Sequence, residues 1–568
     1  MRIIILDGYV DEPTCLGVPP YLSPYPRYIA GSLWVEDHTL DIHYVTIDQL
    51  RSNQIYQNKM QSADVIIVIT GMMVPGRYLS GYPVSHRELV DFLQPCRSPL
   101  KILCGPAARH GFGVSGGKQV RDLSFLRTIF DLIITGDPEI VLTELIKNHW
   151  NQESIDLSMK RPDPTSIRKH AIQGARLVKQ HPNFPQYLIC EIETYRGCPR
   201  AVCGGCSFCI EPLKGLPQFR QPEAIIKEIQ ALYTAGIRHV RIGNQPCLFS
   251  YLARDTGKNE FPTPNPLALE QLFKGIWAVA PDLQTLHIDN VNPGVLAHHP
   301  EESKRIAETI IKYHTSGDVA AFGVESVDPD VIKANNLKGS AEEIKKAVQL
   351  LNSVGAQRGK TGLPELLPGL NFVFGLQGET KETFQLNYAF LQDLVDEGLL
   401  VRRINLRQVI PLPGTRMEKL GTKLVHKHKH LIHQFKRNVQ QNIEQPLLKA
   451  LAPRYTVLTD VYLEKHDGKT TFGRQLGSYP LLIGIPGVYP LHQFFKVKIT
   501  DHGYRSLTAI PYPLDINKAP RETLEAIPGI GKKRAVRLLA KRPFHHANQI
   551  KEALDDDEVV QSLKPFLQ

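Results

Sequence analysis

The chain has 568 residues, which is too long for one hydrophobic core, so several domains are expected. With 42% hydrophobic and 22% charged residues it is ordinary for a globular protein, and no apolar run approaches the roughly 18 residues that span a bilayer. The amino terminus lacks the apolar length of a signal peptide, so we expect a cytoplasmic protein without a membrane partner. The net charge of +10 is concentrated in residues 402–454 and 518–542, which favours a polyanion such as nucleic acid, although a solvated helical face would explain either stretch alone.

Residues 1–150 are predicted to form a doubly wound, Rossmann-like α/β domain. Short apolar segments that end near Gly or Asp indicate buried parallel strands at residues 2–8, 40–48, 63–71, 100–106 and 131–137. Such a sheet binds ligands at the carboxyl ends of its strands, which Gly71, Gly105 and Gly136 mark here. Residues 151–187 are interpreted as a connector.

Residues 188–415 repeat the alternation of strand and amphipathic helix over a length that suits six βα units. The predicted strands are residues 188–194, 239–244, 285–291, 320–326, 370–376 and 404–410. Parallel strands joined in this way close into a full or partial barrel, here (β/α)6, whose chemistry lies in the loops after the carboxyl ends of its strands.

The remainder of the chain is predicted to contain three further segments. Residues 416–452 form a basic helical linker, and residues 453–512 alternate with the two-residue period of antiparallel strands, which indicates a small β-barrel. Residues 513–568 are helical again and contain the sequence PGIGKK.

Four of the nine cysteines lie within twelve residues, after the first strand of the predicted barrel. Cytosolic thiols more often bind metal or catalyse than form disulfides. The stretch ETYRGCPRAVCGGCSFC resembles the signature loop of the radical S-adenosylmethionine (SAM) superfamily. This resemblance implies that Cys198, Cys206 and Cys209 hold a [4Fe-4S] cluster with one iron left open for SAM, and that Phe208 is the aromatic residue before the last ligand.

The spacing of this loop departs from the usual C-x3-C-x2-C of the superfamily. Seven residues separate Cys198 from Cys206. Cys198 is preferred as first ligand because it follows Arg-Gly and precedes Pro; Cys203 is the alternative. A zinc site of four thiolates is the main structural alternative.

Later motifs resemble those that bind SAM in the superfamily, in the same order along the barrel. The candidates are Gly243, Asn244 and Gln245 in RIGNQP, Asp289 in HIDNVNPG, Glu325 and Ser326 in FGVES, and Gly375 and Gly378 in FGLQGE. The resemblance implies reductive cleavage of SAM to methionine and a 5′-deoxyadenosyl radical that takes hydrogen from a substrate. It also implies a reductant such as ferredoxin or flavodoxin. No catalytic protein residue is identified.

The two carboxyl-terminal segments provide clues to the substrate. The stretch 453–512 resembles a TRAM domain, an RNA-binding barrel, in which Arg474, Tyr479 and Arg505 would contact RNA; the alternative is a barrel that only caps the catalytic domain. PGIGKK resembles a helix-hairpin-helix, where Gly529 and Gly531 shape a turn and Lys532 and Lys533 attract phosphate.

The amino-terminal domain resembles both the cobalamin-binding domain of radical SAM methylases and the first domain of methylthiotransferases, which carries three cysteines. Cys15 and Cys104 follow the first and fourth strands, but the third strand has no cysteine, so a second cluster is not expected; cobalamin is a possible cofactor. The leading hypothesis is a radical SAM enzyme that modifies RNA, in particular transfer RNA. The rivals are a cobalamin-dependent methylase of a protein or small molecule and a non-catalytic iron–sulfur protein that binds nucleic acid.

Overall fold

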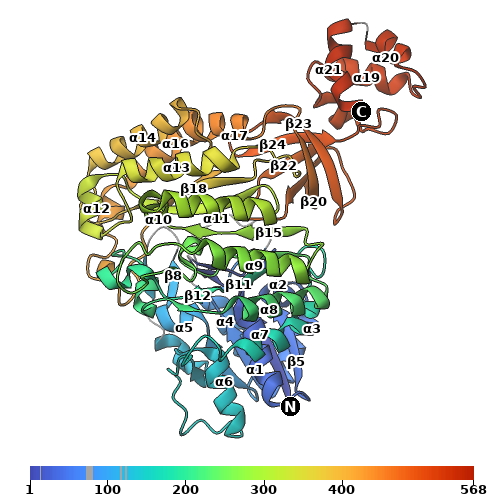
Figure 1. Cartoon of the computed structure of the whole chain (residues 1–568). Coiled ribbons are helices and arrows are strands. Elements are labelled where there is room, and N and C mark those ends of the chain that lie inside the picture. Colours follow the sequence, from blue (N-terminus) through green and yellow to red (C-terminus); the bar gives the residue numbers. More distant parts are fainter. Residues whose placement is uncertain (13, 72–80, 115–117, 122–123, 555, 568) are drawn as a thin grey trace.

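The computed structural model describes residues 1–12, 14–71, 81–114, 118–121, 124–554 and 556–567. It confirms the predicted fold class. An α/β domain at the amino terminus lies beside a parallel (β/α)6 partial barrel, which is followed by a closed five-stranded barrel and a terminal helical unit that projects from the molecule (Figure 1). The closed barrel differs from the purely antiparallel one predicted, because residues 482–484 pair in parallel with residues 506–508; its other strand pairs are antiparallel. Within the described part of the chain, none of the helices has the length and apolar character needed to cross a bilayer.

The amino-terminal sheet has the strand order β10-β7-β6-β1-β5, and all its pairs are parallel. Its strands are β1 (Arg2–Asp7), β5 (Asp41–Thr46), β6 (Val65–Ile69), β7 (Leu100–Cys104) and β10 (Leu132–Ile133). Alternation along β1 sends Ile3 and Ile5 into the core shared with the partial barrel, and Ile4 and Leu6 into a second core on the other face. Flanking helices are α1 (Pro24–Glu36), α2 (Ile47–Ser52), α3 (Gln54–Gln61), α4 (His86–Leu93), α5 (Pro106–His110) and α6 (Pro138–Lys147).

The partial barrel contains the six predicted strands, all paired in parallel. They are β11 (Ile189–Ile192), β14 (His239–Ile242), β15 (Thr285–Ile288) continued by β16 (Asn290–Val291), β17 (Asp318–Glu325), β18 (Leu366–Phe374) and β19 (Arg403–Gln408). The intervening helices include α8 (Pro222–Ala235), α9 (Pro266–Val279), α11 (Pro300–Tyr313), α12 (Pro329–Asn335), α13 (Ala341–Gly355) and α14 (Lys381–Asp396). Amphipathic sequences place their apolar faces on the strands and their charged faces in solvent.

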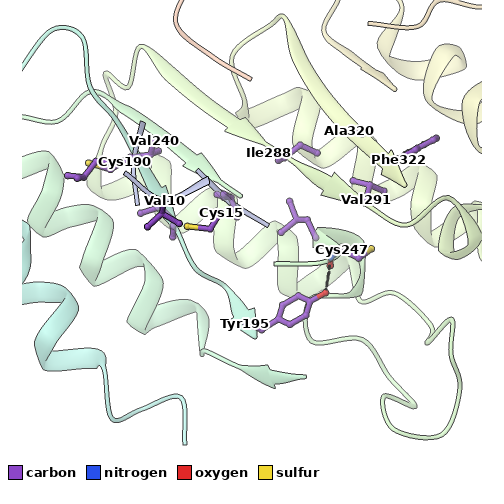
Figure 2. Packing of buried hydrophobic residues seen from close by; sticks show 14 of the residues in the cluster. Val10, Cys15, Cys190, Tyr195, Val240, Cys247, Ile288, Val291, Ala320 and Phe322 are labelled. Atoms are coloured by element: carbon purple, nitrogen blue, oxygen red, sulfur yellow. Dashed lines mark hydrogen bonds between the residues drawn. The ribbon is translucent and has the colours of Figure 1, made fainter. Parts of the chain in front are cut away.

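The amino-terminal segment adds a strand to the partial barrel. Strand β4 (Tyr21–Leu22) pairs in parallel with β11, so the sheet order is β15-β14-β11-β4. Val10 and Cys15, from the segment between β1 and β4, pack in the same core as Cys190 and Val240 (Figure 2). The first two domains therefore share one hydrophobic core.

The closed barrel has the order β20-β21-β22-β24-β23 and follows the basic linker helices α15 (Lys423–Lys427), α16 (Lys429–Val439) and α17 (Gln445–Leu451). Its strands are β20 (Val457–Asp467), β21 (Thr470–Gln475), β22 (Leu482–Pro486), β23 (Phe494–His502) and β24 (Ser506–Pro511). The terminal unit contains α18 (Arg521–Glu525), α19 (Lys532–Ala540), α20 (Ala547–Leu554) and α21 (Asp557–Leu567), and it has its own small core.

The loop between β21 and β22 docks the closed barrel on β15, and it also faces residues at the amino ends of the partial-barrel strands, such as Thr285 and Arg402. The Ser478 amide donates to His287 Nδ1 (2.8 Å), and the Ser478 hydroxyl donates to the Ile288 carbonyl (2.7 Å). A Cβ at Gly477, whose φ is +156°, would lie 2.4 Å from the His287 ring, so only glycine fits. The cysteine loop follows the carboxyl end of β11, so the closed barrel covers the end opposite to it.

Candidate metal centre and cofactor site

The cysteine loop is closed at its base by a short antiparallel ribbon of β12 (Tyr195–Arg196) and β13 (Gln218–Phe219). The Cys198 amide donates to the Gly215 carbonyl (2.9 Å) inside this ribbon. Gly197 has φ +87°, and a Cβ there would lie 2.5 Å from the Leu216 carbonyl oxygen. The Gly that precedes Cys198 is therefore required by the tight fold of the loop.

Cys198, Cys206 and Cys209 lie close enough for the charge of one thiol to affect the pKa of another. Burial, with a smaller contribution from the nearby Cys206 thiol, raises the pKa of Cys198 to about 12. Burial also raises the pKa of Cys209, and the negative charges of Glu211, Cys206 and Cys198 contribute to this rise. Cys203 is exposed, and its thiol lies 3.2 Å from the Arg200 carbonyl oxygen.

The donor set suits a cluster better than a single ion. Among the described residues, no three Cys, His, Asp or Glu side chains converge on one metal ion. In a [4Fe-4S] cluster each thiolate binds a different iron atom, so its ligands do not need to meet at one point. Three partly buried thiols on a loop of fixed shape fit that requirement.

The turn after α12 holds the cysteine loop in place. The Ser207 amide donates to the Asn335 carbonyl (3.0 Å), and its hydroxyl donates to Asn335 Oδ1 (2.7 Å). Asn336 Nδ2 donates to the carbonyls of Cys203 (3.1 Å) and Gly205 (3.0 Å). The stretch KANN, residues 333–336, thus holds the cysteine loop in position.

Two cations beside the thiols were not found by sequence reasoning. Arg200 Nη1 donates to Cys206 Sγ (3.2 Å), and Lys338 lowers the pKa of Cys206, although burial keeps it raised overall. Lys338 Nζ lies 3.5 Å from Glu325 Oε1, in space that exists because Gly323 has no Cβ. Arg200 lies between the cysteines in the sequence, which was a usable signal; Lys338 is remote in sequence and gave none.

Glu325 lies at the carboxyl end of β17, facing this group of charges. Its φ of +65° is unusual for a residue with a side chain, and strain of this kind is common at functional sites. Burial raises the pKa of Glu325, while the Lys338 ammonium lowers it. Ser326 is turned away, since its hydroxyl lies 3.3 Å from Asn387 Oδ1 and accepts from the Asp328 amide.

The predicted residues after β14 have mainly structural contacts. Gln245 is buried, accepting from the Thr194 hydroxyl (3.1 Å) and donating to the Ile242 carbonyl (2.9 Å). Asn244 Nδ2 donates to Glu193 at 3.4 Å. A Cβ at Gly243 would lie 2.3 Å from Glu191 Oε2, so this glycine leaves room for a buried ion pair.

That ion pair brings Asp289 into the barrel interior. Arg241 binds Glu191 Oε1 at 2.7 Å and Asp289 Oδ2 at 3.3 Å, and all three are buried. Burial raises the pKa of Asp289, whereas Arg241 and a hydrogen bond with Tyr479 lower it. Glu191 Oε2 and Asp289 Oδ1 have no partner within the described residues, so polar atoms are left over for a ligand in the barrel.

Gly375, Gly378 and Phe208 are the remaining residues that the sequence predicted to bind the cofactor. Gly375 and Gly378 have φ values of +89° and +86° after β18, and the Gly375 amide donates to Glu379 (2.7 Å). Phe208 is half-buried and packs against the shared core.

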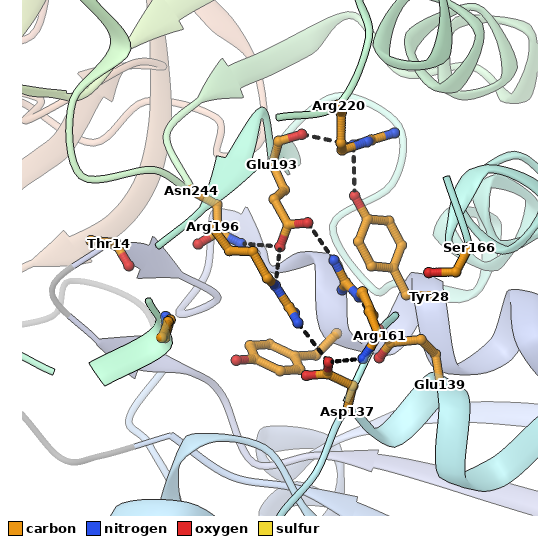
Figure 3. Close-up of polar contacts among 12 residues, drawn as sticks. Thr14, Tyr28, Asp137, Glu139, Arg161, Ser166, Glu193, Arg196, Arg220 and Asn244 are labelled. Atoms are coloured by element: carbon orange, nitrogen blue, oxygen red, sulfur yellow. Dashed lines mark hydrogen bonds and ion pairs between the residues drawn. The ribbon is translucent and has the colours of Figure 1, made fainter. Parts of the chain in front are cut away.

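A buried ionic network connects the cysteine loop to the amino-terminal domain (Figure 3). Asp137 accepts from Arg196 (2.6 Å) in the loop and from Arg109 (2.6 Å), and Arg161 connects Glu139 to Glu193. Burial would raise the pKa of Asp137, but the surrounding guanidinium groups hold it well below its usual range. The cysteine loop is thus braced by charges from both domains.

The predicted nucleic-acid residues occupy different environments. Arg474 is largely buried, bound to Glu464 (2.6 Å) and to the Tyr187 hydroxyl, and Tyr479 points at Asp289, so both face the catalytic domain. Arg505 is exposed and paired with Glu444. In the terminal unit Gly529 has φ +82°, and Gly531, Lys532 and Lys533 are exposed at the start of α19.

Cys15 and Cys104, the amino-terminal cysteines considered for a second cluster, are both buried and have different polar neighbours. Cys15 is buried near Glu12 and Arg241, toward the partial barrel. Cys104 is the buried last residue of β7, and its thiol lies 3.5 Å from the Val68 carbonyl oxygen. The strand-end glycines contact protein: a Cβ at Gly71 would meet the Asp11 amide, and one at Gly136 the Met159 carbonyl.

Residues 192–391, which hold the cysteine loop and most of the partial barrel, match the family model described as the Radical SAM superfamily. The chain belongs to this superfamily. This radical SAM protein is 48% identical over 511 residues to a protein of Methanocaldococcus jannaschii described as uncharacterized, covering 89% of this chain and 92% of that one. It is 24% identical over 360 residues to the ribosomal protein uS12 methylthiotransferase RimO of Bdellovibrio bacteriovorus, covering 60% of this chain and 68% of RimO. The structure of the radical SAM methyltransferase TsrM from Kitasatospora setae covers 73% of this chain and 74% of TsrM, at 14% identity and a TM-score of 0.49.

Proposed function

We propose that this radical SAM enzyme binds a [4Fe-4S] cluster through Cys198, Cys206 and Cys209 and modifies a nucleotide of RNA, with transfer RNA as the expected substrate. When bound, the cluster supplies the electron that cleaves SAM. The observation that carries the enzymatic part is the loop of three neighbouring thiols facing Glu325 and Lys338 at the carboxyl ends of the barrel strands.

The protein residues around the thiols have distinct proposed roles. Arg200 and Lys338 offset the negative charge of the thiolates, since cations near sulfur favour its deprotonated form. Lys338 and Glu325 present one positive and one negative group, which suits the carboxylate and the amino or ribose groups of SAM. Asn335 and Asn336 hold the loop so that the thiols keep their positions.

The RNA part of the proposal is supported mainly by the terminal helical unit. The glycines of PGIGKK shape a turn that ends at the amino terminus of α19, where free amides favour phosphate. Lys532 and Lys533 are exposed there, and neither has an ion pair among the described residues. Arg474 and Tyr479 support this part less, because their side chains bind other parts of the chain.

The cluster assignment is tested by single Cys→Ala variants after anaerobic reconstitution. Cys198→Ala, Cys206→Ala and Cys209→Ala should lose the [4Fe-4S] signal in electron paramagnetic resonance and should form no 5′-deoxyadenosine. Cys203→Ala is the matched control in the same loop and should retain both. Loss of the cluster in the Cys203 variant with retention in the Cys198 variant would transfer the first ligand to Cys203.

RNA binding is tested with the double variant Lys532→Glu/Lys533→Glu. Removing two phosphate contacts should reduce the slope of log affinity against log salt by roughly 1.4 for single-stranded RNA. Lys304→Glu/Arg305→Glu, an exposed pair on α11 with the same charge change, is the matched control. Equal effects of both variants, or unchanged nucleosides in RNA from cells lacking the gene, would refute the RNA assignment and leave SAM cleavage standing.

Cobalamin is the second candidate cofactor of the same enzyme. The strand order β10-β7-β6-β1-β5 has a switch point between β1 and β6, where doubly wound sheets bind ligands. Stoichiometric cobalamin in anaerobically purified protein would favour a methylase. Methylthio transfer, the activity named for RimO, has less support because the third strand of the first domain has no cysteine.

A further inference from the structure

A cavity of about 240 Å³ lies between the partial barrel and the closed barrel, at the end of the molecule opposite to the cysteine loop. One wall consists of residues at the amino ends of the parallel strands, including His239, Thr285 and Arg402. The facing wall is the loop 475–481 of the closed barrel, with Phe494 beside it. At roughly 30 Å³ per water molecule, the space exceeds what a single ion needs.

Arg402 is the unusual residue of this cavity. It is only 6% exposed, and among the described residues its Nε has no hydrogen-bond partner and its guanidinium has no salt bridge. Its backbone amide donates to the Pro368 carbonyl (2.8 Å). Burial and, to a smaller extent, the neighbouring Arg403 lower the pKa of Arg402 to about 9. Buried charges are normally paired, so an unpaired guanidinium in a cavity wall indicates a missing anion.

The other charged groups around the cavity do not supply that anion. Asp318 is buried and engaged by His314 (3.1 Å) and His287 (3.7 Å). Asp460 is exposed at the edge and accepts from the Thr459 hydroxyl (2.7 Å). The cavity is therefore positive around Arg402.

The uncharged lining indicates which anion would fit. The Thr315 hydroxyl lines the cavity and accepts from the Leu286 amide (3.1 Å), so its own hydrogen can be donated to an oxyanion. The Ser316 and Thr361 hydroxyls beside it are bonded to each other (2.8 Å) and add polar surface to the wall. Leu363, Leu481 and Phe494 add an apolar wall. A ligand with a phosphate at one end and an apolar or aromatic group at the other matches both parts.

We propose that this cavity binds a small phosphate ester, with Arg402 as its counterion. The site is separate from the cysteine loop, and the proposal does not depend on the RNA substrate. A ligand here would contact both the catalytic barrel and the closed barrel. Its binding would favour one position of the closed barrel, and the fraction of protein in that position would rise with the ligand concentration.

The test uses thermal denaturation and calorimetric titration of the full-length protein with inorganic phosphate and phenyl phosphate. Both should raise the Tm above that in sodium chloride of equal ionic strength, phenyl phosphate more strongly, and phenol should have no effect. Arg402→Met should weaken binding of phenyl phosphate at least about tenfold, because a charge-assisted hydrogen-bond pair is lost. Without ligand this variant should be no less stable than wild type, since an unpaired buried charge is removed.

Arg305→Met, on the exposed face of α11, is the matched control and should bind like wild type. Arg402→Lys keeps the charge without the fork and should retain part of the binding, which covers the case in which the Met variant fails to fold. Absence of phosphate-dependent stabilisation in wild type would overturn the proposal. Stabilisation by a short RNA but by neither small phosphate, if lost in Arg402→Met, would also overturn the small-ester assignment.

Discussion

Asp137 is the carboxylate on which the junction between the first domain and the cysteine loop depends. It is 1% exposed and binds Arg196 and Arg109 at 2.6 Å each, and it accepts from the Arg161 amide at 2.7 Å. Asp137→Asn removes the charge but keeps the shape, so two guanidinium groups lose their counterion. Breaking a buried ion pair in this way costs about 3–5 kcal/mol. We expect the lower end, about 3 kcal/mol, because both arginines are about one-fifth exposed.

The assay is denaturant unfolding followed by tryptophan fluorescence, since Trp34 and Trp150 belong to the first domain. Asp41→Asn, the same change in an exposed pair with Arg2, is the control and should cost about 0–1 kcal/mol. The buried variant should also retain less iron after reconstitution, because Arg196 is then free to move with the loop. A loss of stability no greater than that of the control would refute the claim that Asp137 holds the junction.

Two further predictions concern the loop anchor and pH. Asn335→Ala removes the acceptor of the Ser207 hydroxyl, so iron content should fall while far-ultraviolet circular dichroism stays unchanged; unchanged iron content would argue against the anchoring role. Burial raises the pKa of Asp7 to about 6, above its usual 3.8, despite hydrogen bonds from Tyr44 and Tyr9. Its contribution to stability is therefore present below pH 3.8 and lost as the pH rises through 6. Relative to Asp7→Asn, wild type should lose on the order of 3 kcal/mol between pH 4 and pH 8 in urea unfolding, and a pH-independent difference would contradict this.

The fold could be predicted from local sequence patterns because most helices and strands have their own hydrophobic periodicity. Apolar runs such as residues 65–69 and the amphipathic helix 341–355 predict strand and helix whatever surrounds them. The two-residue strand β4 could not be predicted, because Tyr21 and Leu22 have no periodicity and owe their conformation to pairing with β11.

The candidate site was predicted where it is contiguous in sequence and missed where it is assembled by folding. The cysteines and the strand-end Glu325 were recognised from their motifs. Lys338 and Arg402 were not, since a single cation in a charged sequence is ordinarily a surface residue. In the structure Arg402 is buried, and Lys338 is partly buried beside Glu325. Arg474 is the reverse case. The sequence predicted that it contacts RNA, whereas in the structure it forms an ion pair with Glu464 and a hydrogen bond with Tyr187.

The pairing of β4 with β11 means that the catalytic sheet is completed by a segment synthesised well before it. A fragment beginning after the connector would leave Ile189 and Cys190 on an open edge, which invites aggregation. The first domain is thus a structural component of the partial barrel as well as its neighbour, and we expect the two to fold as one unit. Long-range pairing of this kind also slows folding, so the nascent chain must keep Tyr21 and Leu22 available until the barrel strand emerges.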